Sequence, residues 1–283
     1  MTFAASRARS RVLPATGRLL ISTDLHGNWE DWSRLRALFD ESRARGEDTH
    51  WALLGDLVHG PDEHAAREMP ELHGFEDRSA DVVDAAAQLV EQNPERVHFV
   101  LGNHDAGHVG GTHTTKFHPD EVAALEARLS PLQRERLDRL FRHAMLALVA
   151  PCGVFLSHGS PGDALTSLSQ LDRPFPPMST GINETLWSYG QRGDVTDRLL
   201  ARISAETRLS LKLVLHGHDR DESGWFTEGG NQAQAVIFGA LPENKRIIWL
   251  DLAARYQTLG DLREGIEVQC LHPRSLAILR GDH

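Results

Sequence analysis

Aspartate, asparagine and histidine side chains recur at the carboxyl ends of five expected strands, in short motifs that each contain a glycine. They are Asp24 and His26 in STDLHGN, Asp56 in GDLVHG, Asn103, His104 and Asp105 in GNHD, His158 in LSHGSP, and His216 and His218 in LHGHD. One such residue is weak evidence, because aspartate is also a common turn former. Five occurrences point to a ligand site, since ligands of open α/β sheets bind outside the carboxyl ends of the strands.

The side chains in these motifs are suitable ligands for divalent metal ions. Oxygen donors and neutral imidazoles suit Mn, Fe, Zn and similar ions, and no motif offers a thiolate. The candidate ligands are too many for one ion and indicate two ions that share a carboxylate: Asp24, His26, Asp56, Asn103, His158, His216 and His218. Two ions about 3.5–4 Å apart stabilise the attacking and leaving oxygens of an in-line displacement and lower the pKa of a shared water.

Strands that alternate with helices are expected to position these motifs. Buried strands are predicted at 18–23 and 50–56 and in RVHFVLGNHD and LKLVLHGHD, and LALVAPCGVFLSHGSP predicts a hairpin that turns at 151–153. Helical spacing of apolar residues predicts helices over 29–46, 79–94 and 194–206 and a mostly helical segment over 120–144. Loops are expected at 60–78 and 159–183, and closing strands at 233–241 and 246–252. The alternation predicts a layered α/β fold.

Composition and charge narrow the class of protein. The chain has 283 residues, 40% hydrophobic and 25% charged, as in an ordinary globular protein. A formal net charge of −10 disfavours a nucleic-acid partner, because such proteins neutralise phosphates with lysine and arginine. No stretch approaches the ~20 apolar residues of a membrane span, and the two cysteines, Cys152 and Cys270, form no CxxC pair. We expect a cytoplasmic protein with no membrane partner.

The domain organisation is expected to be simple. We find no internal repeat and no segment rich enough in proline, glycine or serine to mark a domain boundary. Residues 18–283 are therefore expected to form one domain, and residues 1–17 a basic tail or an extra strand.

Taken together, the motifs DLHGN, GDLVHG, GNHD, SHG and HGH resemble those of the calcineurin-like metallophosphoesterase superfamily. Within it, the chain is most similar to the phosphoprotein phosphatase family of serine/threonine phosphatases and its bacterial relatives. The similarity runs from about residue 18 to 252 and includes ETLWSYG followed by RGD. It implies a four-layer α-β-β-α sandwich with two metal ions at its rim, and hydrolysis of phosphoesters.

The resemblance also implies a role for each motif residue. The first ion would be held by Asp24, His26, Asp56 and His218, and the second, bridged by Asp56, would be completed by Asn103, His158 and His216. His104 would be the general acid that protonates the leaving alkoxide, because the pKa of a free imidazole lies near neutral pH.

The sequence departs from the family pattern directly after the GD motif. Where the phosphatases carry Asp-Arg-Gly, His59 and Gly60 replace the acid that supports the catalytic imidazole and the arginine that binds phosphate. Asp105 or Asp62 are the alternative supports for the imidazole of His104 that the sequence offers.

The phosphate-binding arginines of the family are also fewer here. Leu101 stands where the family has an arginine before GNH. Arg192 in GQRGD aligns with a later family arginine and is a candidate for binding phosphate, because a guanidinium contacts two phosphate oxygens at once. A solvated loop arginine is the alternative. The histidines of the loop after GNHD line either the cleft or a polar surface: His108, His113 and His118.

Three functional hypotheses follow from these features. The first is a phosphomonoesterase, with phosphoserine and phosphothreonine of proteins among its substrates, in which a hydroxide bridging two ions attacks phosphorus. Mn is the expected metal, with Fe, Zn, Ni and Co as alternatives. The second is a hydrolase of dinucleoside polyphosphates or phosphodiesters at the same centre, so that the partner is a phosphoprotein or a small phosphoester or nucleotide. The third, a non-catalytic metal-binding scaffold, is disfavoured by His104 beside a full ligand set.

Overall fold

The computed structural model describes residues 8–172 and 179–273, which form two β-sheets and the helices that cover them. One sheet has six strands in the order β1 (Ser10–Val12), β5 (Ala147–Ala150), β6 (Val154–Leu156), β7 (Leu213–His216), β9 (Gln232–Ala235) and β8 (Trp225–Glu228). The other has five, in the order β11 (Val268–Cys270), β10 (Arg246–Asp251), β2 (Arg18–Ser22), β3 (Thr49–Leu53) and β4 (Val97–Phe99).

The strands that precede the predicted site residues run parallel within each sheet. β2, β3 and β4 pair in parallel in the five-stranded sheet, and β6 and β7 pair in parallel in the six-stranded sheet. The carboxyl ends of parallel strands lie at the same edge of a sheet, where the segments that follow them meet. This topology brings motifs that are far apart in the chain to a common rim.

Alternation of apolar side chains along the strands separates an inner core from an outer one. Leu19 and Ile21 of β2 belong to the same apolar cluster as Leu156 of the other sheet, whereas Leu20 packs on the opposite face. The two-residue repeat of a strand makes this separation possible, because successive side chains point to opposite faces. Burying each such leucine contributes roughly 1.5–3 kcal/mol, and these contacts fix the two sheets that carry the rim.

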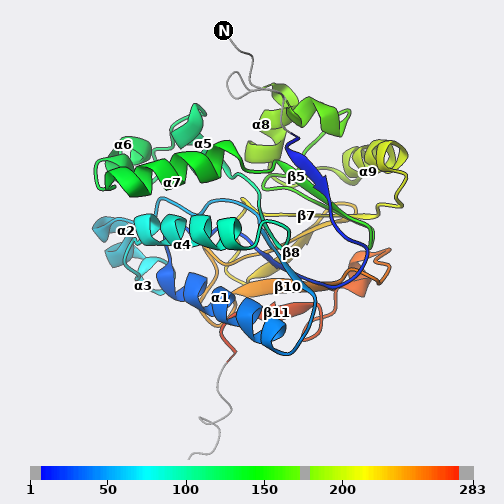
Figure 1. Cartoon of the computed structure of the whole chain (residues 1–283), viewed down its shortest axis with the longest axis horizontal. Helices are drawn as coiled ribbons and strands as arrows, with labels where there is room; N and C mark the ends of the chain where they lie inside the picture. The colour runs from blue at the N-terminus through cyan, green and yellow to red at the C-terminus, as the bar shows by residue number, and fades with distance from the viewer. Residues whose placement is uncertain (1–7, 173–178, 274–283) are drawn as a thin grey trace, which may run out of the picture.

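Helices cover the outer faces of the two sheets (Figure 1). α1 (Trp29–Ala44), α4 (Ser79–Gln92) and α7 (Pro131–Arg142) lie side by side on the five-stranded sheet, and α9 (Gly193–Thr207) packs on β7 of the other. Trp32 of α1 stacks on Trp51 of β3 with ring centroids 5.4 Å apart, and Phe141 of α7 stacks on Phe99 of β4 at 5.7 Å. The α-β-β-α sandwich predicted from the sequence is confirmed.

The remaining elements are short and lie mainly in the connections around the rim. They are α2 (Glu63–Glu68), α3 (Pro70–His73), α5 (Asn103–Ala106), α6 (Glu121–Glu126), α8 (Thr180–Trp187) and the 3-10 helices η1 (Gly107–Val109), η2 (Leu168–Asp172) and η3 (Leu259–Asp261). Within residues 8–172 and 179–273, none of the helices combines the length and the apolar character that a bilayer crossing requires.

Several local expectations differ from the structure. Residues 60–78, expected to be a loop, contain α2 and α3, because the carboxylate of Asp62 caps α2 by accepting from the Ala65 backbone N–H at 2.8 Å. The segment 120–144 divides into α6 and α7, since Ser130 caps α7 and Pro131 begins it. The strand expected over 233–241 ends at residue 235, and it pairs with β8, which was not expected.

The structure describes only part of the expected tail over 1–17 and only part of the expected loop over 159–183. Residues 10–12, within the expected tail or extra strand, form β1, which pairs in parallel with β5. The loop expected over 159–183 contains η2 and the first residues of α8, and its residues 173–178 lie outside the described segments.

Candidate metal centre

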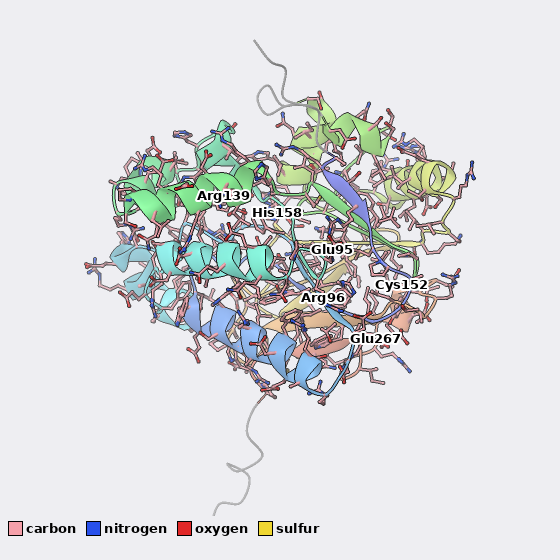
Figure 2. The ribbon with its side chains drawn as sticks, viewed as in Figure 1. Glu95, Arg96, Arg139, Cys152, His158 and Glu267 are labelled. Atoms are coloured by element: carbon pink, nitrogen blue, oxygen red, sulfur yellow. The ribbon has the colours of Figure 1, made fainter. Side chains whose placement is uncertain are left out.

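Six of the predicted site residues line one cavity of about 750 Å³ at the rim of the sandwich. They come from the segments that follow β2, β3, β4 and β7: Asp24, His26, Asp56, Asn103, His104 and His218. His158, which follows β6 and is labelled in Figure 2, is fully buried and contacts this set through Asn103. Residues from both sheets therefore converge on one site.

Four of these residues adopt a left-handed backbone conformation that non-glycine residues rarely adopt. The φ angles of Asp24, His26, Asp56 and His218 lie between 45° and 77°. Each such residue costs of order 1–3 kcal/mol and persists only where surrounding contacts impose it, as at functional sites. Here the backbone N–H of His26 donates to the Asp56 carbonyl at 2.9 Å, and that of His218 donates to Oδ2 of Asp24 at 3.1 Å. These hydrogen bonds stabilise the left-handed backbone conformation, which directs the four side chains towards one another.

His26 directs a lone pair at two carboxylates. Its Nε2 lies 3.6 Å from Oδ2 of Asp56 and 4.0 Å from Oδ1 of Asp24. Its Nδ1 lies 3.1 Å from the carbonyl oxygen of His59. A carbonyl only accepts, so Nδ1 carries the proton and Nε2 is free to bind a cation. The ring of His104 lies in the same group, with ligand atoms of His26, Asp56 and His104 within 4.8 Å of one another.

A second set of ligand atoms lies around the carboxylate of Asp56 and the amide oxygen of Asn103. Nε2 of His158 lies 3.4 Å from Oδ2 of Asp56 and 2.9 Å from Oδ1 of Asn103, and Nδ1 of His218 lies 3.0 Å from the same Asn103 oxygen. Nδ1 of His158 donates to the Leu54 carbonyl at 2.7 Å, so its Nε2 carries a lone pair. Lone pairs of His158 and Asn103 therefore face each other, an arrangement that a cation between them would stabilise.

The electrostatics of the two sets also suit divalent cations. Burial, together with the charge of Asp56, raises the pKa of Asp24 well above its usual range. Burial lowers the pKa of His26 and His158 and lowers that of His218 to about 3, so these imidazoles are neutral, the form that binds metal. Asp56 is common to both sets, and the residues present fit two ions that share this carboxylate.

The two histidines of LHGHD occupy different places from those expected. His218, assigned by the resemblance to the first ion, lies with Asn103 and His158, the expected ligands of the second. His216, assigned to the second ion, groups instead with Asp219 and Glu228. The strand ends at His216, and the positive φ of His218 breaks the two-residue alternation that would have aligned the two rings.

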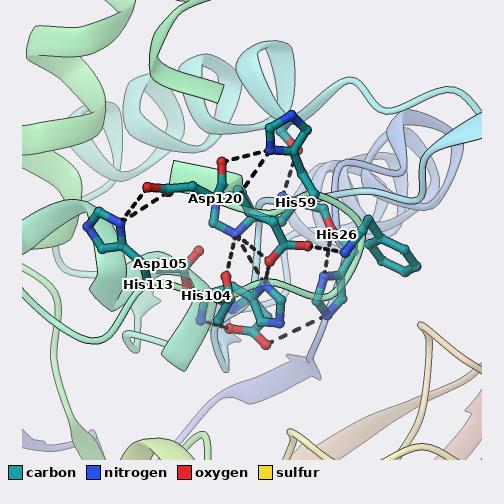
Figure 3. Close-up of polar contacts among 12 residues, drawn as sticks. His26, His59, His104, Asp105, His113 and Asp120 are labelled. Carbon is teal, nitrogen blue, oxygen red and sulfur yellow. Dashed lines mark hydrogen bonds and ion pairs between the residues drawn. The ribbon is translucent and has the colours of Figure 1, made fainter. Parts of the chain in front are cut away.

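Glu121 lies where a support for the imidazole of His104 is needed, next to the His104 and His59 rings that Figure 3 labels. Its Oε2 lies 3.4 Å from Nδ1 of His104 and 3.6 Å from Nδ1 of His59. Burial alone would raise the pKa of Glu121, but its interactions with His104 and Thr114 outweigh burial and lower the pKa to about 2. A buried, ionised carboxylate is therefore present although the family aspartate is replaced by His59.

Two further buried histidines extend the contact network around His104. Nδ1 of His59 lies 3.1 Å from Nδ1 of His104, and its Nε2 lies 3.0 Å from Nε2 of His108. Nδ1 of His108 in turn lies 3.1 Å from Oε1 of Glu126. His108 is thus buried behind the site, whereas His113 lines the cavity and His118 is exposed outside it.

Neither of the aspartates considered from the sequence supports His104. Asp105 accepts from the backbone N–H groups of Asp56, Leu57 and Gly102 at 2.7, 3.0 and 3.0 Å. It therefore ties the segment after β3 to the segment after β4 (Asp105 is labelled in Figure 3). Asp62 caps α2.

Two basic residues that sequence reasoning missed line the cavity, and the one it proposed does not. The side chain of Arg192 is 82% exposed, forms ion pairs with Asp194 and is absent from the cavity wall. Lys116 and Arg220 line the wall, and burial lowers the pKa of Lys116 to about 7. Lys116 Nζ lies 4.0 Å from the ring centroid of Phe238. The signal for Arg220 was its position directly after LHGHD; nothing local distinguished Lys116.

Structural comparison shows the same fold in known phosphatases. A protein serine/threonine phosphatase from Saccharomyces cerevisiae with similarity to human phosphatase PP5 is 15% identical, with a TM-score of 0.57, covering 86% of this chain and 76% of that one. A cold-active protein-tyrosine phosphatase of the psychrophile Shewanella sp. is 13% identical, with a TM-score of 0.55, covering 87% of this chain and 78% of that one. A search of curated proteins gives no significant match.

The family comparison is more specific than the fold comparison. The family model described as calcineurin-like phosphoesterase matches residues 17–221, which is most of the chain and includes every motif around the candidate metal centre. The chain therefore belongs to the calcineurin-like phosphoesterase family and is a hydrolase of that class.

Proposed function

We propose that this protein is a metal-dependent phosphomonoesterase. The observation that carries the proposal is the position of Asp56, which is shared by two sets of ligand atoms at the floor of a cavity whose wall contains His104, Lys116 and Arg220. Oxygen and imidazole ligands around a shared carboxylate suit two divalent ions. We propose His26, Asp24 and Asp56 for the first ion, and Asp56, Asn103, His158 and His218 for the second.

The side chains of the wall supply the remaining parts of a phosphoryl-transfer site. Two divalent ions, when bound, would polarise phosphoryl oxygens and lower the pKa of water. Lys116 and Arg220 neutralise phosphate oxygens at the wall, as charge-assisted hydrogen bonds do. His104 lies beside the first set of ligands and donates a proton to the leaving oxygen. Glu121 keeps the imidazole of His104 in one orientation, since its carboxylate faces Nδ1.

The finer assignments of the proposal are manganese as the metal, phosphoserine or phosphothreonine in proteins as the substrate, and the cytoplasm as the location. The donor set has no sulfur ligand, which suits manganese among the expected ions. Both cysteines are free, as in a reducing compartment.

An exposed aromatic residue supports a second candidate function, hydrolysis of dinucleoside polyphosphates or phosphodiesters. Tyr189 lines the cavity, is 67% exposed and lies with its ring centroid 5.0 Å from that of His218. Trp187 lines the same wall. A base can stack on such a surface, and stacking contributes about 1–3 kcal/mol per base.

A substrate panel separates these functions. The protein is supplied with Mn²⁺ and assayed with p-nitrophenyl phosphate, bis-p-nitrophenyl phosphate, a phosphoserine peptide and diadenosine tetraphosphate. Turnover of the first and third substrates supports the phosphomonoesterase. Turnover of only the second or fourth rejects it in favour of the alternative, and no turnover by a metal-loaded protein indicates a scaffold.

Two variants test the proposed centre itself. Asp56→Asn removes the shared charge and is expected to lose both ions and nearly all activity, measured by mass spectrometry of metal content and by the panel. His104→Ala is expected to retain metal and to slow phosphoserine hydrolysis by about 10²–10⁴-fold, the usual contribution of a general acid. The same variant is expected to affect p-nitrophenyl phosphate much less, because p-nitrophenolate leaves without a proton. Equal losses on both substrates contradict this role.

A further inference from the structure

His216, Asp219 and Glu228 form a second cluster of potential ligands beside the candidate metal centre. Their ligand atoms lie within 4.8 Å of one another. They come from the end of β7, the segment after it and the last residue of β8. From this geometry we propose that a third divalent transition-metal ion binds between His216, Asp219 and Glu228, separately from the two ions of the proposed phosphoesterase centre.

His216 presents a lone pair that has no partner. The residue is 1% exposed. Its Nδ1 lies 2.9 Å from the Gly217 carbonyl oxygen, which can only accept, so the proton of the neutral ring is on Nδ1. Its Nε2 is buried and has no hydrogen-bond partner among the described residues. A buried polar atom without a partner destabilises the fold, and an ion bound at Nε2 removes that cost.

Asp219 contributes a second buried atom without a partner. It is 8% exposed, and its Oδ2 has no hydrogen-bond partner in the described part of the chain. Its backbone is fixed from both sides by Gln234, whose Oε1 accepts from the Asp219 N–H at 3.2 Å and whose Nε2 donates to the Asp219 carbonyl at 2.7 Å. The backbone of Asp219 is therefore held in place while one oxygen of its carboxylate stays available.

Glu228 completes the cluster from the edge strand of the six-stranded sheet. Its carboxylate lies directly against Gly190, where an added Cβ atom would overlap Oε2. A glycine is therefore required at position 190 for Glu228 to reach the cluster. Gly190 ends the segment ETLWSYG, whose Trp187 and Tyr189 line the neighbouring cavity.

The composition of the cluster indicates the kind of ion. Two carboxylates and one neutral imidazole lie together, and a divalent cation would offset the repulsion between the carboxylates. One nitrogen and two carboxylate ligands suit Zn²⁺ or Mn²⁺, with water completing the coordination. Ca²⁺ and Mg²⁺ prefer sites made of oxygen ligands alone.

Metal counting tests this inference without reference to activity. The full-length protein and its variants are loaded separately with Zn²⁺ and with Mn²⁺, dialysed, and analysed for ions per chain by mass spectrometry. We expect three ions in the parent protein, two in Glu228→Gln and in Asp219→Asn, one in Asp56→Asn, and none in Asp56→Asn/Glu228→Gln. Glu228 is partly exposed, so Glu228→Gln is expected to fold, and circular dichroism checks this.

A control variant and a second test variant make the result specific to the cluster. Glu222→Gln changes an exposed glutamate between β7 and β8 and is expected to retain all three ions. Gly190→Ala is expected to lose the same single ion as Glu228→Gln, because the added methyl group displaces the carboxylate. Two ions in both the parent protein and Glu228→Gln overturn the third site and leave the phosphoesterase centre intact.

The remaining outcome identifies the source of a failure. If His216→Gln loses an ion while Asp219→Asn and Glu228→Gln do not, His216 belongs to the two-ion centre and the third site is rejected. If Asp56→Asn retains every ion, the proposed phosphoesterase centre is wrong, whatever the result for Glu228.

Discussion

The carboxylate of Glu121 lies 3.4 Å from Nδ1 of His104, although the two residues belong to different helices and are 17 positions apart. His59 stands where the family resemblance implies an acid that supports the imidazole, and Glu121 faces the imidazole of His104 from α6. A carboxylate therefore still contacts the proposed general acid, but it belongs to Glu121 of α6.

Replacing Glu121 by glutamine is expected to slow turnover through the orientation of His104. We predict a kcat about 10-fold lower for a phosphoserine peptide, which is part of the 10²–10⁴-fold that a general acid contributes, and little change for p-nitrophenyl phosphate. Asp62→Asn, which removes only the cap of α2, is the control. A uniform loss on both substrates would indicate a structural defect.

Arg220 and Arg192 are expected to differ in their effect on substrate binding. Arg220→Ala should raise KM about 10–100-fold, the range for loss of a hydrogen bond to a charged group. Arg192→Ala should change KM less than about twofold, since an exposed ion pair contributes little. The measurement is steady-state kinetics with p-nitrophenyl phosphate. The assignment of phosphate binding to Arg220 fails if the two effects are reversed.

The lowered pKa of Lys116 predicts a dependence of KM on pH. With a pKa of about 7, Lys116 is charged below pH 7 and loses its charge above it, so KM should rise as the pH increases through 7. Lys116→Arg should remove this rise, because a guanidinium stays protonated. The parent protein and the variant are compared with the same substrate at each pH, which cancels the ionisation of the substrate. A KM that rises equally in both excludes Lys116 as the cause.

A buried histidine pair far from the cavity predicts sensitivity to acid. Nε2 of His98 on β4 lies 3.4 Å from Nδ1 of His50 on β3, and burial lowers the pKa of His98 to about 3. The unfolded chain binds a proton below about pH 6.5 while the folded chain does not, so stability falls as the pH decreases from 6.5 towards 3. His98→Asn should reduce this fall by up to about 1.4 kcal/mol per pH unit.

Urea unfolding at pH 6.5, 5.5 and 4.5 measures this effect. His64→Asn is the matched control, because the side chain of His64 is 68% exposed and its loss should leave the slope unchanged. Identical slopes for the parent protein and His98→Asn would exclude the pair as a source of acid sensitivity.

The layers of the fold could be predicted from the sequence because each strand and helix has its own repeat of apolar residues. Alternation around Leu20 and helical spacing around Trp32 and Phe39 each reflect the repeat of a single element. The glycine-containing motifs were equally informative about Asp24, Asp56 and their neighbours, since each follows a recognisable strand. Short helices in 60–78 were missed because a single cap at Asp62 determines one of them.

The site was predicted less completely where contacts between distant segments determine which residues reach it. Glu121 and Lys116 lie in loops or helices whose local sequence says nothing about the cavity they face. The separation of His216 from His218 depends on one left-handed residue, which sequence spacing does not reveal. Arg192 aligned with a family arginine but lies outside the cavity, because alignment carries no information about side-chain direction.

The carboxylate of Asp105 couples two turns of the rim. Its three contacts join the turn that holds Asp56 to the turn that holds Asn103, so these two move as one body. The turn carrying His218 is held by a different set of contacts: its backbone donates to Asp24, and the Gly217 N–H donates to the His158 carbonyl at 2.7 Å. The two halves of the rim are thus braced independently and meet at the amide oxygen of Asn103, which lies against both His158 and His218.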